Sequence, residues 1–265
     1  MRKAGRISPE PFSIVRCSSC LHIRVNPRIA NDDLGELYDE AYYRGDGFDA
    51  SVNYSGAVST WTRAENARII ETVVEARRRP IAQARWLDFG CGTGTLVEAV
   101  VTAGAIGIGT DDSDAAIAAC RKREIDVVSI ADLESQLGTF DVVSAIEVIE
   151  HVPDPISFVR HLKRFLKPGG IIYVHTENWN VVRRLPGTPY LMPEGHIQYF
   201  SPRVMRMIFG SAGLREVDAF DRCWFVWRRL PASVKRLIPA AWLRASRAVL
   251  VRNFPEYAPF PVAEA

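Results

Sequence analysis

The sequence has no apolar run long enough to cross a bilayer, and it carries no large excess of charge of either sign. A membrane-spanning helix needs about 20 consecutive apolar residues, and no stretch of this chain approaches that length. The 33 Lys and Arg residues against 31 Asp and Glu leave a net charge of only +2, whereas nucleic-acid-binding proteins are typically strongly basic. These absences argue against an integral membrane protein and against a nucleic-acid partner.

Cysteine is also scarce, since the 265 residues include five, and this odd number does not suggest a disulfide framework. The N-terminus has early positive charge, but Pro9 and Pro11 stand where a signal peptide needs an apolar stretch. The sequence therefore predicts a cytoplasmic protein. A hydrophobic content of 48% and a charged content of 24% are those of a globular chain, which excludes disordered and fibrous classes.

Four segments can be separated along the chain. Residues 1–45 are loop-rich and form a small N-terminal extension, and residues 46–80 form a helical lead-in with a helix predicted over 56–79. Residues 81–222 alternate short apolar runs with helical patterns, which is typical of a parallel sheet with crossover helices and predicts an α/β fold. Residues 223–265 are rich in Trp and Arg and do not continue the alternation.

The third segment contains the apolar runs and helical patterns of the predicted sheet. Strands are predicted at Arg85–Phe89, Gly104–Thr110, Asp126–Ile130, Phe140–Ile146, Gly170–His175 and Leu214–Phe220. Helices are predicted between them at Thr95–Ala103, Asp114–Arg123, Ile156–Phe165 and Pro202–Ala212. Ligands of α/β folds bind outside the carboxyl ends of the strands, so functional residues are expected in the loops that follow them.

The run Trp86–Gly94 delivers a glycine-rich turn from a predicted buried strand into a helix. Glycines let the backbone turn sharply and let a ligand approach main-chain N–H groups at the helix N-terminus. A dinucleotide fingerprint requires G-x-G-x-x-G, but the sixth position is Thr95 counted from Gly90 and Val97 counted from Gly92. The observed spacing is D-x-G-x-G-x-G, which argues against a nicotinamide oxidoreductase.

An acid follows the next predicted strand at Asp111, 21 residues after Gly90. A carboxylate at a strand tip can accept hydrogen bonds from both hydroxyls of a ribose. A lone acid there is usually a helix cap, and Asp112, Ser113 or Asp114 could cap the following helix. Together with the glycine-rich turn, the position favours a ribose-binding role for Asp111.

Four motifs in this order resemble the class I S-adenosylmethionine-dependent methyltransferases, particularly the type 11 and type 12 small-molecule subgroup that includes quinone-biosynthesis and sugar methyltransferases. The matching residues are Leu87–Gly94, Gly109–Asp111, Phe140–Pro155 and Leu166–Gly170. The resemblance implies a Rossmann-like, doubly wound seven-stranded sheet, mostly parallel with a reversed last strand. It also implies S-adenosylmethionine as the cofactor, bound at Asp88, Gly90, Cys91, Gly92, Gly94, Asp111, Asp112, Asp132, Ile146 and Glu147.

Several of these positions also have an ordinary structural interpretation. Asp132 is either an acceptor for the adenine amino group or a solvated loop acid, and Glu147 either lies at the methionine end of the cofactor or starts a helix. The Asp88 side chain either organises the glycine-rich turn or faces the cofactor's ammonium group.

Two histidines are candidate catalytic bases. Methyl transfer from a sulfonium is an in-line displacement, and alignment alone can contribute roughly 7–11 kcal/mol in the best cases, so a base is useful but not mandatory. His196 precedes a predicted helix N-cap at Ser201, and His151 follows the fourth predicted strand; a pKa of about 6.5 suits both for proton removal. Alternatively, each holds a loop in place, and His161 and His175 are expected at a helix surface and a strand end.

The N-terminal segment contains two further features. By the resemblance, Tyr38, Tyr42 and Tyr43 belong to a segment that closes over the cofactor or substrate, and burial against the main domain is the alternative. Cys17-x-x-Cys20 is half of a zinc site, which normally has four ligands, whereas the similar sugar C-methyltransferases carry a full zinc ribbon. We therefore expect no metal and a degenerate ribbon that forms a β-hairpin.

The C-terminal segment holds Trp224, Trp227 and Trp242 among basic residues. Such a composition is compatible with peripheral contact with an anionic membrane, and such segments also cover substrate pockets or dimer faces. The leading hypothesis is a methyltransferase for a small-molecule acceptor, with oxygen favoured over carbon or nitrogen. The alternative is a non-catalytic protein of the same fold that docks a partner or a membrane through this segment.

Overall fold

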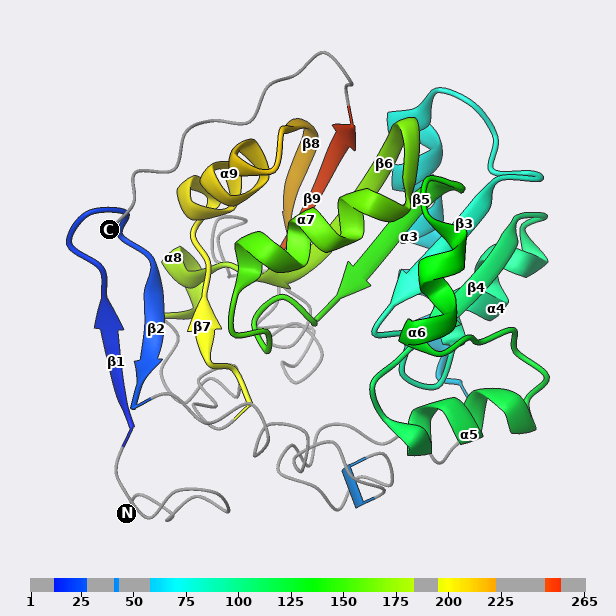
Figure 1. Cartoon of the computed structure of the whole chain (residues 1–265), viewed down its shortest axis with the longest axis horizontal. Helices are drawn as coiled ribbons and strands as arrows, with labels where there is room; N and C mark the ends of the chain where they lie inside the picture. Colours follow the sequence, from blue (N-terminus) through cyan, green and yellow to red (C-terminus); the bar gives the residue numbers. More distant parts are fainter. Residues whose placement is uncertain (1–11, 28–40, 43–57, 184–194, 223–245, 254–265) are drawn as a thin grey trace, which may run out of the picture.

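The described part of the chain forms a central sheet covered by helices and a small side sheet (Figure 1). The computed structural model describes residues 12–27, 41–42, 58–183, 195–222 and 246–253. Among these residues, no helix is both long and apolar enough to cross a membrane.

A six-stranded, mostly parallel sheet forms the centre. Its strands are β3 (Arg85–Phe89), β4 (Ile106–Thr110), β5 (Phe140–Ile146), β6 (Leu166–Glu177), β8 (Leu214–Arg222) and β9 (Ser246–Asn253). Their order is β4-β3-β5-β6-β9-β8. The first four are mutually parallel, whereas β9 runs antiparallel to both of its neighbours. The carboxyl ends of β3, β4, β5 and β6 therefore meet at one edge.

The segment predicted as a strand over Asp126–Ile130 lies parallel to β4, but it forms only an isolated bridge between Gly109 and Val127 and no longer ladder. Ser129 then caps the short helix α6 (Ile130–Leu133), its side chain accepting a hydrogen bond from the Asp132 N–H group. The chain therefore leaves the sheet edge before a longer ladder can form.

The reversed strand implied by the resemblance is β9, which lies within residues 223–265, the segment in which the sequence analysis predicted no strand. Strand β9 pairs with β6 from Ser246 opposite Glu177 to Arg252 opposite Ile171, and it also pairs with β8. The sheet therefore also includes residues 246–253, which lie beyond the predicted boundary at residue 222.

Helices cover both faces of this sheet (Figure 1). They are α3 (Thr60–Arg77), α4 (Thr95–Thr102), α5 (Asp114–Lys122), α7 (Pro155–Phe165) and α9 (Pro202–Ser211). Successive strand residues point to opposite faces: Trp86 packs in a core with α3 and α4, whereas Leu87 packs in a core with α7 and α9. The predicted cap Ser201 is confirmed, and Ser113 caps α5.

The expected N-terminal hairpin is present and belongs to the small sheet. Strands β1 (Ser13–Arg16) and β2 (Ile23–Asn26) are antiparallel, and β2 also pairs with β7 (Gln198–Tyr199). Ile23, Val25 and Tyr199 form its buried core. Because β2 pairs with β7, the hairpin is held against the segment that follows His196. The turn between β1 and β2 carries Cys17 and Cys20.

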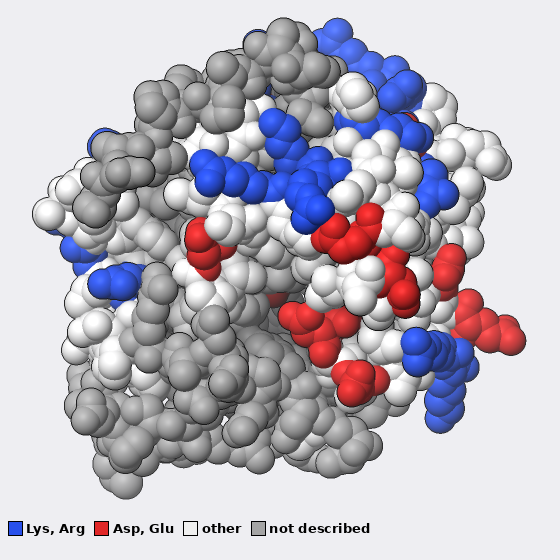
Figure 2. Space-filling view, in the orientation of Figure 1, with Lys and Arg blue, Asp and Glu red and all other residues white. Residues whose placement is uncertain are grey.

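Basic side chains gather over α7 and α9 on the face drawn in Figure 2, and the middle of this face is hollowed, with acidic side chains along one edge. The basic residues of α7 already have partners. Arg160 and Lys163 donate to the Ser211 and Ala212 carbonyl oxygens, and Arg164 pairs with Glu134 at 2.7 Å. This patch therefore stabilises the packing of α7 against its neighbours.

The glycine-rich turn gives a stability prediction. Gly90 has a φ of +75°, and a Cβ atom there would lie 2.5 Å from the stiff Val148 side chain, whereas Gly138, with a φ of +67°, has nothing within 4 Å. Gly90→Ala should lower the free energy of unfolding by about 1–3 kcal/mol more than Gly138→Ala, because both add left-handed strain and only the first adds a clash. Urea denaturation without cofactor measures the difference; equal losses would contradict the packing argument.

Candidate active site

The glycine-rich turn after β3 is held against the end of β4. The Gly90 and Cys91 N–H groups both donate to the Thr110 carbonyl oxygen, at 2.8 and 3.0 Å. Gly90, Gly92 and Gly94 all have positive φ angles, between 53° and 75°. The turn is therefore a compact main-chain surface that leads into α4, as a ligand lying against it requires.

Asp111 connects this turn to the next helix. Its carboxylate accepts hydrogen bonds from the Gly92 N–H at 2.8 Å and from the Ser113 N–H at 2.9 Å. The side chain is half-buried. The predicted strand-tip acid therefore lies beside the glycine-rich turn, whereas Asp112 is exposed and its cofactor role remains a prediction.

Asp88 lies beneath the turn in a buried chain of hydrogen bonds. The Trp86 indole donates to Ser144 Oγ at 2.8 Å, and this hydroxyl donates to Asp88 Oδ1 at 2.6 Å. Burial raises the pKa of Asp88 to about 7, against the effect of the Ser144 hydrogen bond and with a further contribution from the Asp111 charge. These hydrogen bonds link Asp88 to β5, and both of its predicted roles, organising the turn and facing the cofactor's ammonium group, remain predictions.

The Cys91 side chain packs in the protein interior. It is buried with Val97, Cys120 and Ile125 in a small apolar cluster, and a Cβ atom on Gly109 would meet its sulfur at 2.7 Å. The Cys91 thiol therefore packs in the core, and a cofactor contact at Cys91 remains a prediction.

The end of β5 is strained at Glu147. This residue has a φ of +53°, which is uncommon for a non-glycine residue and clusters at functional sites. Its N–H donates to the His175 carbonyl oxygen at 2.9 Å, and its carboxylate lies 2.7 Å from His175 Nδ1. Glu147 thus joins the ends of β5 and β6, while the preceding Ile146 packs against the core.

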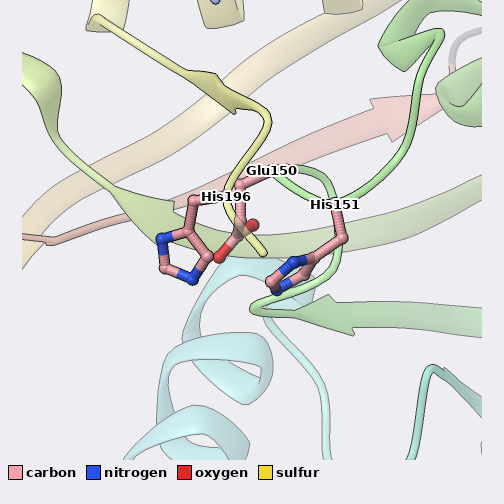
Figure 3. Close-up of side chains that lie close together, drawn as sticks. All are labelled: Glu150, His151 and His196. Carbon is pink, nitrogen blue, oxygen red and sulfur yellow. The ribbon is translucent and has the colours of Figure 1, made fainter. Parts of the chain in front are cut away.

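The two predicted catalytic histidines lie next to each other (Figure 3). The rings of His151 and His196 meet edge to face with their centres 4.9 Å apart. His151 Nδ1 lies 2.8 Å from the Gly195 carbonyl oxygen, and the Ile197 N–H donates to the Glu150 carbonyl oxygen at 3.1 Å. Since a carbonyl only accepts, His151 carries its proton on Nδ1.

Two buried glutamates complete this group. Glu150 is fully buried, and its Oε2 accepts a hydrogen bond from Thr176 Oγ1 at 2.8 Å. Glu177 is 2% exposed, and its Oε1 lies 3.6 Å from His196 Nδ1. Their carboxyl groups come from the loop after β5 and the end of β6.

The carboxyl groups of this cluster differ in pKa. Burial raises the pKa of Glu147 and of Glu177 well above the usual range, and the neighbouring carboxylates add to the effect. Burial also acts to raise the pKa of Glu150, but the charges of His151 and His196 outweigh it and lower this pKa. The cluster therefore favours one anion, Glu150, between neutral acids and two imidazoles.

Two sets of side chains in this cluster could hold a cation. Glu150, His151 and His196 offer ligand atoms within 4.8 Å of one another, and so do Glu147, Glu150 and Glu177. Carboxylate and imidazole groups are common ligands of divalent cations.

The other predicted site residues lie elsewhere. Asp132 is exposed on α6, and its carboxylate accepts a hydrogen bond from Ser129 Oγ at 2.7 Å, so its adenine role remains a prediction. Tyr42 is half-buried, whereas Tyr38 and Tyr43 lie outside the described residues.

Three site residues were missed by sequence reasoning. Glu150 stands beside His151 in the quoted motif, so its position was available. His175 and Glu177 end the apolar run of β6, where charged residues in an otherwise buried strand are an unused signal.

The comparisons with known proteins agree with this geometry. A family described as "Methyltransferase domain" matches residues 60–219. The ubiquinone biosynthesis O-methyltransferase of Thiobacillus denitrificans is 35% identical over 155 residues, covering 52% of this chain and 67% of the relative. The enzyme of that name from Xanthomonas axonopodis is 32% identical over 173 residues, covering 58% and 72%. The match to the ubiquinone biosynthesis O-methyltransferase of Pseudomonas aeruginosa PAO1 spans only 48% of that enzyme.

Solved structures share the fold at low identity. An S-adenosylmethionine-dependent methyltransferase from Archaeoglobus fulgidus has a TM-score of 0.53 at 20% identity, covering 71% of this chain and 94% of that one. Magnesium protoporphyrin IX methyltransferase from Synechocystis with bound S-adenosylhomocysteine has a TM-score of 0.52 at 16% identity, covering 75% and 90%. The [4+2]-cyclase SpnF has a TM-score of 0.53 at 20% identity, covering 76% and 85%.

The raised pKa of Asp88 predicts a pH effect on stability. A buried acid with a folded-state pKa of about 7 binds more protons when folded than unfolded, so its contribution to stability falls as the pH rises to 7. Asp88→Asn should remove this dependence: its stability relative to wild type should rise by up to about 3 kcal/mol between pH 5 and pH 8. Urea denaturation at several pH values measures this; parallel curves for both proteins would contradict the assignment.

Proposed function

Since the chain belongs to the class I S-adenosylmethionine-dependent methyltransferases, we propose that it transfers the methyl group of that cofactor to an oxygen atom of a small molecule. The glycine-rich turn fastened to Asp111 is the observation that carries the cofactor site. The oxygen acceptor is supported by the similar ubiquinone biosynthesis enzymes, whose names describe them as O-methyltransferases.

The cofactor site follows the edge where the parallel strands end. The main chain of Gly90–Gly94 lies against the methionine part, Asp111 accepts hydrogen bonds from the ribose hydroxyls, and Asp132 faces the adenine. Glu147, held at the end of β5, lies beside the methyl-bearing sulfur. A cap formed by the segment around Tyr42 and a membrane contact by the part of residues 223–265 that lies outside β9 extend the same proposal.

The histidine and glutamate cluster supplies the acceptor side of the reaction. His196 would accept the proton of the acceptor hydroxyl, and the bound cofactor would supply the methyl group, with its sulfonium sulfur as the leaving group. The Glu150 carboxylate stabilises the imidazolium that forms. Because Glu147 and Glu177 favour their neutral forms, they add no further negative charge that would repel an acceptor oxyanion.

Calorimetric titration with S-adenosylhomocysteine, with NAD as the comparison ligand, tests the cofactor. Binding of the first alone supports the proposal, and labelled S-adenosylmethionine then reports transfer to phenolic, amine or carbon acceptors. Labelled product only from amine or carbon acceptors would overturn oxygen as the acceptor atom. Cofactor binding with no transfer to any acceptor would favour the non-catalytic alternative.

The ribose assignment gives a binding prediction. Asp111→Ala should weaken S-adenosylhomocysteine binding by about 1–3 kcal/mol, because a charged hydrogen-bond acceptor is lost. Asp114→Ala, which removes a nearby exposed acid in α5, is the matched control and should bind as wild type. Calorimetry measures both affinities, and thermal unfolding shows whether each variant is folded. Unchanged affinity in folded Asp111→Ala would refute the ribose role.

The proposed base gives a kinetic prediction. His196→Asn should lower kcat roughly 100- to 10,000-fold and remove the increase of the rate with pH that deprotonation of a histidine produces. His161→Asn, on α7, is the control and should retain both. Binding of S-adenosylhomocysteine should be unchanged in either variant, which separates lost catalysis from misfolding. A His196→Asn enzyme with wild-type kcat would exclude His196 as the base.

A further inference from the structure

The turn between β1 and β2 brings Cys17 and Cys20 close together. The Leu21 N–H donates to the Cys17 carbonyl oxygen at 3.1 Å, and the Cys17 N–H donates to the His22 carbonyl oxygen at 2.8 Å. The first bond gives the turn the four-residue spacing of a helix, in which Cα atoms three residues apart are about 5 Å apart. Disulfides join residues whose Cα atoms lie about 4.4–6.8 Å apart.

The two thiols have different surroundings. Cys17 is exposed and Cys20 is half-buried, and neither is in a disulfide. Hydrogen bonds from the main chain of Cys20 and Ser19, followed by one from the Cys20 thiol, lower the pKa of Cys17 to about 7. Because the thiolate is the reactive form, Cys17 is suited to attack a disulfide first. Cys20 is then the resolving thiol, which attacks the mixed disulfide on Cys17.

A metal site would need more ligands than this turn provides. Structural zinc takes four, and within the described part of the chain no third His, Cys, Asp or Glu groups with these two cysteines. The nearest histidine in sequence, His22, stacks on Phe200 with ring centres 5.4 Å apart. A disulfide needs only the two sulfurs, so it is the chemistry that this pair can complete by itself.

We propose that Cys17 and Cys20 form a reversible disulfide by exchange with a low-molecular-weight disulfide such as glutathione disulfide. The Cys17 thiolate attacks one sulfur of that disulfide, which forms a mixed disulfide and releases one thiolate. The Cys20 thiolate then attacks the Cys17 sulfur and releases the second. The protein dithiol loses two electrons, and the small disulfide is reduced to two thiols.

The other described cysteines provide an internal comparison. Cys91 and Cys120 are both buried and pack in one small cluster, and a hydrogen bond with Cys120 together with burial raises the pKa of Cys91. Reagents in solution should therefore modify Cys17 before either of them. The proposal does not depend on the identity of the methyl acceptor or on methyl transfer itself.

The test uses the full chain, reduced and then placed in glutathione buffers of increasing disulfide content. Remaining thiols are blocked with a maleimide, and peptides are mapped by mass spectrometry. We expect Cys17 and Cys20 to lose their thiols together as one internal disulfide, reversed by dithiothreitol. Cys20→Ser should stop at a glutathione adduct on Cys17, whereas Cys17→Ser should leave Cys20 largely unmodified; Ser18→Ala is the matched control and should oxidise as wild type.

A second measurement does not need a variant. At pH 7, Cys17 of the wild-type chain should react with iodoacetamide on the order of tenfold faster than free cysteine, because about half of it is thiolate. Slow alkylation of Cys17, equal adducts on Cys17 and Cys20, or earlier modification of Cys91 and Cys120 would each overturn the proposal. Purification with bound zinc that must be removed before the thiols react would also overturn it, in favour of a metal site.

Discussion

The cost of burying carboxyl groups is the constraint on which the site depends. Removing a charged carboxylate from water costs several kcal/mol unless it is paired or protonated. Asp88 and Glu177 respond with raised pKa values, whereas Glu150 is balanced by His151 and His196. The fold brings these groups together from the ends of β3 and β6 and from the loops after β5 and before β7, so the charge state of the site depends on several distant segments.

The hydrogen bonds of the buried acids also connect the strands. The chain from Trp86 through Ser144 to Asp88 links β3 with β5 beneath the glycine-rich turn. The Thr176 hydroxyl, on β6, donates a hydrogen bond to the Glu150 carboxylate in the loop after β5, so a buried acid also links β6 to this loop. Asp111 then ties the turn to the start of α5. Positioning of the cofactor surface and stability of the strand ends are therefore produced by the same contacts.

Local sequence signals predicted the parts of the molecule that local interactions determine. The glycine spacing, the helix caps and the strands β3 and β5 all follow from neighbouring residues. Strand β9 and the pairing of Glu177 with His196 depend on contacts between distant segments, which a single sequence does not encode in its periodicity. The predicted strand at Asp126–Ile130 had the right apolar pattern, but the cap at Ser129 started a helix there instead.

The small sheet connects the N-terminal hairpin to the acceptor side of the site. The Val25 N–H donates to the Ile197 carbonyl oxygen at 2.9 Å, and Ile23 pairs with Tyr199. His196 immediately precedes this paired segment, while the Ile197 N–H donates to the Glu150 carbonyl oxygen. The hairpin whose turn holds Cys17 and Cys20 is therefore joined through β2 to the main chain that follows His196 and is hydrogen-bonded to Glu150. Pairing of β2 with this segment limits the conformations open to the main chain beside His196, so the hairpin and the histidine cluster belong to one connected part of the fold.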